Sequence, residues 1–383
     1  MLNGLNILPT YTEYFDLDAT TTGLNTASLF IGGVFGPLCS SFIADKCGRR
    51  PAIFLGSSIT LVGVFLQVAA QNIAMFVAAR ILLGFGSAMS GIAAGVYLSE
   101  TFASRYRAWG VGLLNDFYYV GALIAAGTTL GTGRWQSTWA WRAPSAFQGV
   151  FSLSCILILP FVPESPRWLV YKGHSEVARR VVALANSNGD QTSPVVLAVF
   201  SEIVDTLTWE STEGRKITFT QIFKDKISRR RLLIAISAGP FACMAGNVIS
   251  SYYLGPQLDT AGVTSTDDQL KANVVLNVWC LFCALLGTHL IAKWGRKSTA
   301  LTAECLLVTC LFLIGGLTKL YADDPEGTPR SRIYGSVAVM FLFQGFYSVA
   351  WTPLIYVYPS EVLNYSIRAH GLALSQLALY SVA

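Results

Sequence analysis

The sequence predicts an all-α protein that crosses a membrane many times. Charged residues make up 13% of the 383 residues, well below the ~25% of an ordinary soluble domain. Apolar residues make up 53%, and the mean hydropathy is +0.50. The apolar residues gather in long stretches without an amphipathic period, each near the ~20 residues that a helix needs to cross a bilayer.

Nine of these stretches are long enough to be full spans. They lie at 24–44, 51–71, 75–97, 110–131, 144–163, 232–254, 273–293, 299–320 and 333–358. The shorter apolar pieces at 1–8 and 372–383 cannot span a bilayer. No basic residue precedes residues 1–8, so no cleavable signal peptide is predicted.

The short loops differ in basic charge between the two sides of the membrane. Assigning loops to alternate sides puts nine lysines and arginines on one side: Lys46, Arg49, Arg50, Arg105, Arg107, Lys293, Arg296, Lys297 and Arg368. The other side has six: Arg134, Arg142, Lys271, Lys319, Arg330 and Arg332. Because cytoplasmic loops are enriched in basic residues, the loops at 45–50, 99–109 and 358–371 are predicted to be cytoplasmic.

A long polar segment, residues 164–231, divides the chain into three parts. An N-terminal transmembrane bundle covers 1–163, and a C-terminal bundle covers 232–383. Within the segment, residues 176–207 mix charged and apolar residues at helical spacing, which predicts short amphipathic helices on the inner membrane face. Its basic residues favour contact with anionic lipid headgroups, and no nucleic-acid role is predicted.

The chain contains an internal repeat. YLSETFASRYRAWG at 97–110 and YPSEVLNYSIRAHG at 358–371 agree at six of fourteen positions, with an offset of 358 − 97 = 261. DKCGRR at 45–50 corresponds to AKWGRK at 292–297, with an offset of 292 − 45 = 247. Two similar motifs in the same order in each half indicate duplication.

The repeat also predicts what the ends of the chain should look like. Two spans precede AKWGRK, whereas one span and a short piece precede DKCGRR; two spans follow Arg107, whereas a short piece follows Arg368. The expected parent architecture therefore has six plus six helices. On this interpretation the chain is a fragment or shortened product, with helix 1 and helices 11–12 incomplete.

Several motifs together resemble one membrane-protein family. DKCGRRP at 45–51, RILLGFG at 80–86, WRAP at 141–144, PESPRW at 163–168 and GRK at 295–297 follow one another in the order typical of the sugar porter branch of the major facilitator superfamily. MLNGLNILPTYTEYF, GNVISSYYL and AWTPLIYVYPSE are similar to segments of fungal lactose and hexose permeases. The resemblance covers essentially the whole chain.

The resemblance implies a gating charge network at the inner ends of the helices. Its members here would be Asp45, Arg49, Glu100, Arg107, Glu164, Arg167, Arg296, Glu361 and Arg368. Arginine suits this role because its planar guanidinium binds a carboxylate through two hydrogen bonds. We expect the pairs to form when the inner side is closed and to break when it opens. The alternative is that these charges only anchor the topology.

The resemblance also places a sugar site near the membrane midplane between the halves. Asn115 lies where the family has a sugar-binding Gln, and Tyr356 where many members have a Trp. The full set of candidates is Asn115, Asn247, Tyr252, Tyr253, Tyr356 and Gln376. The alternatives are helix–helix hydrogen bonds for the asparagines and interfacial positions for the tyrosines.

The chain departs from the family pattern at several of these positions. Ala242 and Cys243 occupy the stretch where helix 7 carries a Gln, and Cys280 stands at the helix 8 Asn position. Each hydrogen bond lost to a buried ligand costs about 1–3 kcal/mol. We therefore expect a less hydroxylated substrate or a low sugar affinity. The acidic residue of helix 1 that relatives carry lies outside this chain.

The predicted function is secondary-active or facilitative transport of a sugar, such as a hexose or lactose, by alternating access. The expected partners are the sugar, protons and the lipid bilayer of the plasma membrane, with the protein a monomer. No metal or cofactor is expected, nor an enzyme, since the three histidines are scattered and no nucleophile–base arrangement is evident. The alternatives are a non-transporting sugar sensor and an inactive truncated homologue.

Overall fold

The structure is a computed structural model that describes residues 2–103, 106–212, 226–252, 254–323, 330–363 and 368–383. Every regular element in these ranges is a helix. The all-α prediction is confirmed.

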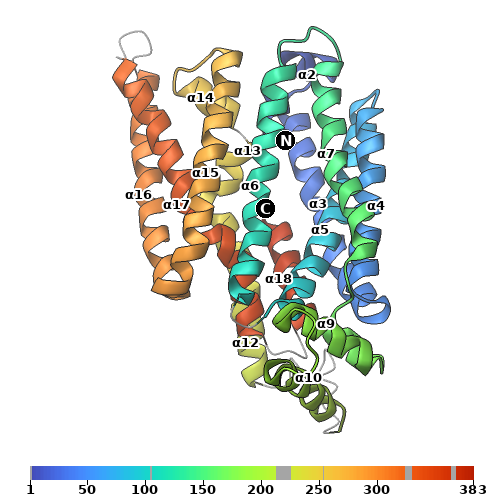
Figure 1. The fold of residues 1–383 in the computed structure, drawn as a ribbon. Helices are drawn as coiled ribbons and strands as arrows, with labels where there is room; N and C mark the ends of the chain where they lie inside the picture. The colour runs from blue at the N-terminus through green and yellow to red at the C-terminus, as the bar shows by residue number, and fades with distance from the viewer. Residues whose placement is uncertain (1, 104–105, 213–225, 253, 324–329, 364–367) are drawn as a thin grey trace.

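The first half is a bundle of long helices preceded by two short ones (Figure 1). The short helices are α1 (Leu2–Asn6) and α2 (Pro9–Tyr14). The long ones are α3 (Ala19–Cys47), α4 (Arg49–Val68), α5 (Ile73–Thr101), α6 (Arg107–Thr132) and α7 (Trp139–Ile158), the last continued by a 3₁₀ turn at Leu159–Phe161.

The second half repeats this pattern with a broken first helix. Helix α12 (Lys226–Ala242) runs through a π-helical turn, η2 (Cys243–Asn247), into α13 (Val248–Tyr252) and α14 (Leu254–Thr260). Three long helices follow, α15 (Thr266–Trp294), α16 (Arg296–Asp323) and α17 (Arg330–Val362), and then α18 (Arg368–Val382).

Three short helices lie together at one end of the bundle, at the bottom of Figure 1. They are α8 (Pro166–Tyr171), α9 (Ser175–Ser187) and α10 (Pro194–Thr212). Helix α9 buries Ala178, Val181 and Val182 and exposes Arg180. The predicted amphipathic helices between the two bundles are thus present, and they mark the end of the molecule that the basic loops predict to be cytoplasmic, called the inner end below.

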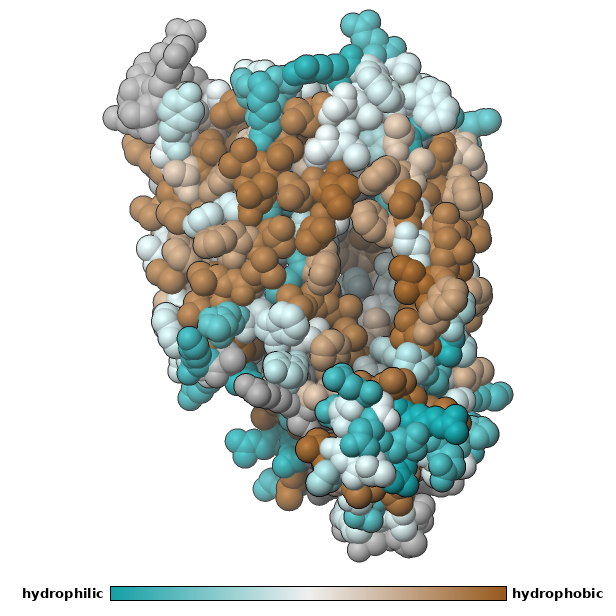
Figure 2. All heavy atoms as spheres, in the orientation of Figure 1, coloured by the Kyte–Doolittle hydropathy of each residue, from teal (hydrophilic) through white to brown (hydrophobic). Residues whose placement is uncertain are grey.

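Seven helices among the described residues are long and apolar enough to cross a membrane. They lie at Ala19–Cys47, Arg49–Val68, Ile73–Thr101, Trp139–Phe161, Thr266–Ile291, Arg296–Leu320 and Tyr334–Val362. The predicted spans 110–131 and 232–254 correspond to α6 and to the broken helix from α12 to α13. Figure 2 shows apolar side chains across the middle of one face and hydrophilic ones at its ends, as expected for an integral membrane protein.

Small residues allow the helices within each half to pack closely. In the first half, Gly32 of α3 lies against the carbonyl of Ile81 and Gly84 of α5 lies against that of Leu29, so that a Cβ at either glycine would overlap the neighbouring backbone. In the second half, Gly287 of α15 lies against the backbone of α17 in the same way. Such contacts are typical of membrane helices, where packing replaces the hydrophobic effect between helices.

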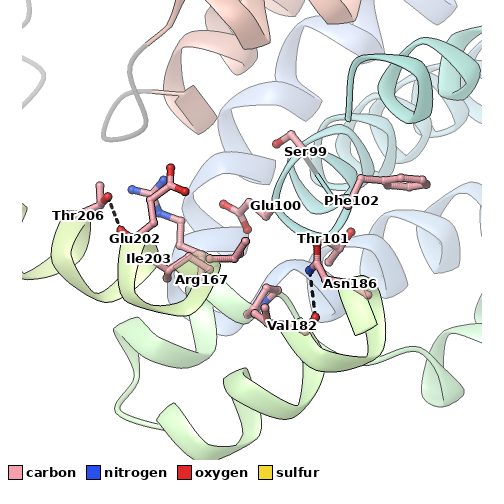
Figure 3. Close-up of a pocket in the computed structure, with 14 residues that line it drawn as sticks. Ser99, Glu100, Thr101, Phe102, Arg167, Val182, Asn186, Glu202, Ile203 and Thr206 are labelled. Atoms are coloured by element: carbon pink, nitrogen blue, oxygen red, sulfur yellow. Dashed lines mark hydrogen bonds between the residues drawn. The ribbon is translucent and has the colours of Figure 1, made fainter. Parts of the chain in front are cut away.

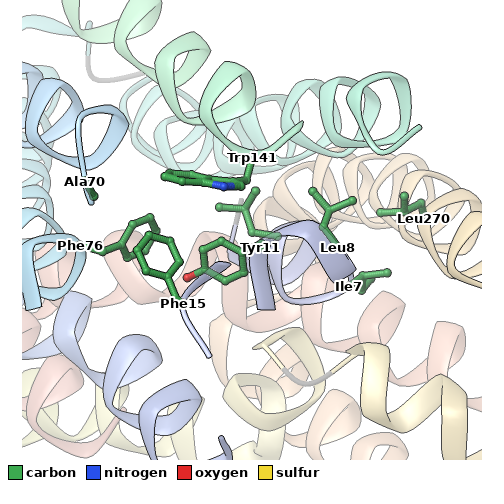
Figure 4. Close-up of a cluster of buried hydrophobic side chains, with 9 residues drawn as sticks. Ile7, Leu8, Tyr11, Phe15, Ala70, Phe76, Trp141 and Leu270 are labelled. Carbon is green, nitrogen blue, oxygen red and sulfur yellow. The ribbon is translucent and has the colours of Figure 1, made fainter. Parts of the chain in front are cut away.

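The short N-terminal helices close the outer end of the bundle. Tyr11 and Phe15 pack with Phe76 of α5 and Trp141 of α7 in a buried aromatic cluster (Figure 4). Leu8 belongs to the same cluster, which also includes Leu270 of α15 in the second half. Residues 2–15 therefore contact both halves at this end.

The first helix of the second half is interrupted at Gly246. This residue has φ +90°, a backbone conformation that glycine adopts without steric strain. Pro240 lies six residues earlier in the same helix and removes one backbone donor. Gly246 faces protein on one side, since Phe343 and Leu311 lie within 4.0 Å of the position that a Cβ would occupy there.

The Gly246 backbone predicts a sharp difference between two glycine variants. Gly246→Ala places a Cβ on a left-handed residue, which costs about 1–2 kcal/mol. Gly315→Ala, in α16 with no neighbour within 4 Å of the added Cβ, should be neutral or stabilise by up to ~1 kcal/mol. The thermal midpoints of the purified variants in detergent should therefore move in opposite directions or differ by several degrees. Equal midpoints would contradict the proposed need for glycine at 246.

Candidate functional site

A cavity of about 410 Å³ lies between the two halves. Its walls come from α1 and α3 to α7 of the first half and from η2, α13, α15 and α17 of the second. The volume falls in the ~300–1,000 Å³ range of small-molecule sites. A ligand in it would therefore touch both bundles at once.

Amide and hydroxyl groups dominate the polar lining of this cavity. The polar members include Ser87, Asn115, Tyr118, Tyr119, Thr129 and Gln148 from the first half, and Asn247, Ser251, Asn273, Asn277, Gln344, Tyr347 and Thr352 from the second. Arg80 is the one charged side chain among the described lining residues. It is buried, and its Nε donates to the carbonyl of Asn25 at 2.9 Å.

Hydrogen bonds fix the orientation of the amides in the second half. Gln344 Nε2 donates to Ser251 Oγ at 3.1 Å, and Ser251 donates in turn to Asn247 Oδ1 at 3.1 Å. On α15, Asn277 Nδ2 donates to the backbone carbonyl of Asn273 at 2.7 Å. The break at Gly246 comes directly before Asn247, so the irregular backbone positions this side chain at the cavity wall.

The structure brings two of the six predicted binding residues to the cavity. Asn115 and Asn247 both line it. Asn115 Nδ2 also donates to the backbone carbonyl of Thr352 on α17, so the helix–helix hydrogen bond considered as its alternative role is present as well.

The remaining predicted binding residues lie elsewhere or outside the described side chains. Tyr356 packs against Gly91 and Gly95 of α5, away from the cavity lining. Gln376 is buried in α18, and it too is outside the lining. The side chain of Tyr252 and the whole of Tyr253 lie outside the described part of the chain.

Sequence reasoning missed several lining residues that carry a usable signal. Asn273 and Asn277 stand four residues apart in an apolar span, which places them on one face of a helix. Cys280 lies one turn further on and also lines the cavity. Helix α15 therefore offers two amides beside Cys280, the position where the family Asn is replaced. Gln344, inside the predicted span 333–358, is a similar isolated polar residue.

At the inner end of the first half, a buried arginine and glutamate form a two-point contact. Arg49 Nε and Nη2 bind the two carboxylate oxygens of Glu100 at 2.9 and 3.0 Å, with side-chain exposures of 10% and 7%. Arg49 Nη1 also lies 3.6 Å from Asp45 Oδ1 and donates to the carbonyl of Ala44. This contact joins α3, α4 and α5 at one point.

Glu164 binds the start of α4 instead of a side-chain cation. Its carboxylate accepts from the backbone N–H groups of Arg49 and Arg50 at 3.1 Å each, and from the N–H of Ser165 at 2.8 Å. A carboxylate is stabilised at a helix N-terminus by the unsatisfied donors and the helix dipole. Ser165 in turn donates to Glu100, which ties the PESPR segment to the Arg49–Glu100 pair.

The second half repeats the arginine–glutamate contact in a more exposed setting. Arg296 Nε and Nη2 bind Glu361 at 2.8 and 2.6 Å, with side-chain exposures of 31% and 38%. Arg296 Nη1 donates to the carbonyl five residues earlier, as Arg49 does. Gly48 and Gly295, each directly before its arginine, both have positive φ, +112° and +84°. The duplication read from the sequence therefore extends to the geometry of these loops.

The ion pairs just described, Arg49 with Glu100 and Arg296 with Glu361, join helices within a half. The inner-end ion pair between the halves that the structure describes is Asp45 Oδ2 with His370 Nδ1, at 3.7 Å, which is a salt bridge only when the histidine is protonated. The prediction did not include His370. The side chains of Arg107 and Arg368 lie outside the described ones, so their predicted pairing stays a prediction.

Arg167 lies beside a second, smaller cavity of about 50 Å³ at the inner end. Glu100 of α5, Asn186 of α9 and Glu202 of α10 also line this cavity (Figure 3). Residues of α5, α8, α9 and α10 thus meet at this cavity, next to Glu100. The role of Arg167 in a gating network stays a prediction.

Comparison with known proteins gives a consistent result. The model of the family described as "Sugar (and other) transporter" matches residues 6–379. An MFS-type transporter of Aspergillus cristatus, criB, is 30% identical over 367 residues, which cover 95% of this chain and 77% of that protein. A high-affinity glucose transporter of Kluyveromyces lactis is 28% identical, covering 95% of this chain and 68% of that one.

Solved structures show the same fold. The proton:xylose symporter XylE bound to 6-bromo-6-deoxy-D-glucose superposes with a TM-score of 0.82 at 21% identity, covering all of this chain and 84% of that one. The E. coli fucose:proton symporter FucP gives a TM-score of 0.56 at 14% identity, covering all of this chain and 85% of that one.

The difference in burial between the two arginine–glutamate pairs predicts unequal costs of neutralisation. Glu100→Gln leaves the buried Arg49 with only the longer 3.6 Å contact to Asp45, so the cost should approach that of a broken buried pair, about 3–5 kcal/mol. Glu361→Gln breaks a partly exposed pair and should cost about 0–1 kcal/mol. Unfolding of the purified variants, followed in mixed micelles with denaturing detergent, measures both changes. Equal losses would show that burial does not set the strength of these pairs.

Proposed function

Because this chain belongs to the sugar (and other) transporter family of the major facilitator superfamily, we propose that it carries a hexose across the membrane by alternating access of its two halves. The observation that carries this proposal is the cavity between the halves, with its lining of amides and hydroxyls. A solute bound there contacts both bundles, so rocking of one bundle against the other exposes it to either side.

The chemistry of the cavity supports an uncharged, hydroxyl-rich substrate. Amide and hydroxyl side chains both donate and accept hydrogen bonds, which matches the hydroxyl groups of a sugar. The aromatic rings of Tyr118, Tyr119 and Tyr347 add apolar faces for the C–H surface of a sugar ring. The lining described here lacks an acidic side chain, which argues against a cationic substrate.

The relatives favour a hexose over other sugars as the first substrate to test. The Kluyveromyces lactis protein and a Candida albicans protein, 28% and 27% identical to this chain, are both named as high-affinity glucose transporters. We extend this to a monomer in the plasma membrane, which is where uptake of an external sugar would take place.

Uptake of labelled glucose, xylose and lactose by transporter-deficient cells expressing this chain tests the proposal. We expect saturable glucose uptake that unlabelled hexose inhibits. Uptake of lactose alone would overturn the hexose assignment but keep sugar transport. Absence of uptake for all three sugars, with the protein present at the cell surface, would overturn transport and favour a sensor or an inactive homologue.

Three polar-to-apolar variants distinguish the cavity from its surroundings. Asn277→Leu and Gln344→Leu each remove an amide from the cavity lining and should raise the KM for glucose roughly tenfold, about 1.4 kcal/mol for one hydrogen bond. Gln376→Leu serves as the matched control because this side chain is buried but outside the lining. Its KM should stay within about twofold of the unmodified protein. A larger effect at Gln376 than at Asn277 and Gln344 would place the sugar elsewhere.

A further inference from the structure

A buried aspartate lies beside the cavity and takes no part in the site described above. Asp116 follows Asn115 on α6 and is 1% exposed. Thr288 of α15 donates its hydroxyl to Asp116 Oδ2 at 2.6 Å. The other oxygen, Oδ1, is buried without a hydrogen-bond partner among the described residues. This carboxyl is therefore held by one neutral donor.

The contact between Asp116 and Thr288 joins the two halves of the protein. Gly112, one turn before Asp116, lets α15 come close, since a Cβ there would lie 3.0 Å from Thr288 Cγ2. Asp116 is nine residues from the inner start of α6 at Arg107, and Thr288 is six residues from the inner end of α15 at Trp294. The pair thus lies in the inner part of the seam between α6 and α15.

No described cation neutralises Asp116. The long helices packed against α6 are α5, α7, α15 and α17. Their titratable or charged groups include Arg80, Tyr97 and Glu100 of α5, Arg142 and Cys155 of α7, Cys280, Cys283, His289 and Lys293 of α15, and Tyr347, Tyr356, Tyr358 and Glu361 of α17, together with Tyr118 and Tyr119 on α6 itself. None of these forms an ion pair or hydrogen bond with Asp116. His289 follows Thr288 in the chain but is exposed on the outside of the bundle.

An ionised carboxylate in this position would carry a large energetic cost. Removing a charge from water into a protein interior costs several kcal/mol unless a counter-charge or several hydrogen bonds compensate. One hydroxyl donor does not supply that compensation. While the seam is closed, we expect Asp116 to be a neutral carboxylic acid. Once water reaches the side chain, we expect it to be an ionised carboxylate.

We propose that Asp116 is a proton-binding site linked to the opening of the inner side. While α6 and α15 are in contact at their inner ends, Oδ1 carries the proton. When the inner ends separate, the O–H bond breaks, the proton passes to water, and Asp116 remains as a hydrated carboxylate. The role of this step in transport rests on the proposed function, but the linkage between proton binding and opening does not.

The linkage has a definite sign. The closed inner side binds one proton more than the open one, so a lower pH favours closure and a higher pH favours opening. For a single proton, the ratio of open to closed protein changes by up to tenfold for each pH unit. Opening toward the cytoplasm therefore releases a proton on that side.

Spin labels on the inner ends of the two helices measure this equilibrium without any substrate. Trp109→Cys on α6 and Lys293→Cys on α15 are both exposed positions for labels. The background lacks the other cysteines and carries His370→Gln, which removes the titratable contact between His370 and Asp45 at the inner end. Distance distributions by electron paramagnetic resonance, recorded between about pH 5 and pH 8 in nanodiscs, should shift toward the longer distance as the pH rises.

Asp116→Asn and a matched control decide the assignment. Asp116→Asn keeps the shape and a hydrogen-bond acceptor but cannot ionise, so its distance distribution should not change with pH. Asp268→Asn removes an exposed aspartate at the other end of α15 and should leave the pH response intact. A pH response that persists in Asp116→Asn overturns the proposal, and so does its absence from the protein with Asp116. Either result would mean that the hydrogen bond between Asp116 and Thr288 is not linked to the opening of the inner side.

A transport measurement separates failure of this inference from failure of the proposed function. In proteoliposomes with a pH-sensitive dye inside, addition of glucose should acidify the interior for the protein with Asp116 and not for Asp116→Asn. Glucose entry without acidification by the former would overturn the proton site but keep sugar transport. A pH-dependent distance without entry of any sugar would keep the proton site and overturn transport.

Discussion

The proposed transport mechanism depends on the contact between the two halves, which must hold in one state and open in another. Within each half, glycines such as Gly32, Gly84 and Gly287 allow backbones to touch, and an Arg–Glu pair joins the inner helix ends. Between the halves, the contacts include single hydrogen bonds such as Asn115 to Thr352 and an Asp–His pair at 3.7 Å. At the inner ends, the two-point Arg–Glu contacts within each half are thus shorter than the Asp45–His370 contact between the halves.

The cost of polar groups in a membrane explains where this protein places them. Many charged side chains lie at helix ends, for example at the inner end, where Glu164 binds backbone donors and Glu100 binds a guanidinium. At mid-depth the polar side chains are mainly neutral amides and hydroxyls that bond to one another, such as Gln344 and Ser251. Neutral groups cost less to bury, and they leave donors and acceptors available to a solute in the cavity. The polar lining is therefore compatible with both membrane insertion and binding.

The sequence predicted the elements of the fold better than it predicted the site. Spans and their duplication follow from composition and from motifs such as GRR and GRK, which depend on local chemistry. Cavity lining depends on how each helix is rotated and on where it breaks. Asn273 and Asn277 form a polar face that periodicity could have identified, whereas the exclusion of Tyr356 from the lining follows from its packing against α5. The π turn at Gly246 carries no clear sequence signal, because glycine is frequent throughout membrane helices.

The position of Asp116 outside the cavity lining determines what kind of coupling it can provide. A proton on a residue that contacts the sugar would act directly on sugar affinity. Asp116 instead contacts Thr288 across the seam, so its protonation changes the balance between open and closed states, and sugar binding changes that balance independently. The proton and the sugar then act on the same equilibrium between open and closed states, so each changes the affinity for the other by the same factor. The size of that factor depends on how differently each ligand binds the two states. Once the titratable contact between His370 and Asp45 is removed, neutralising Asp116 should therefore abolish the remaining dependence on pH while the hydrogen bonds to the sugar remain. A shared binding site could not produce this separation.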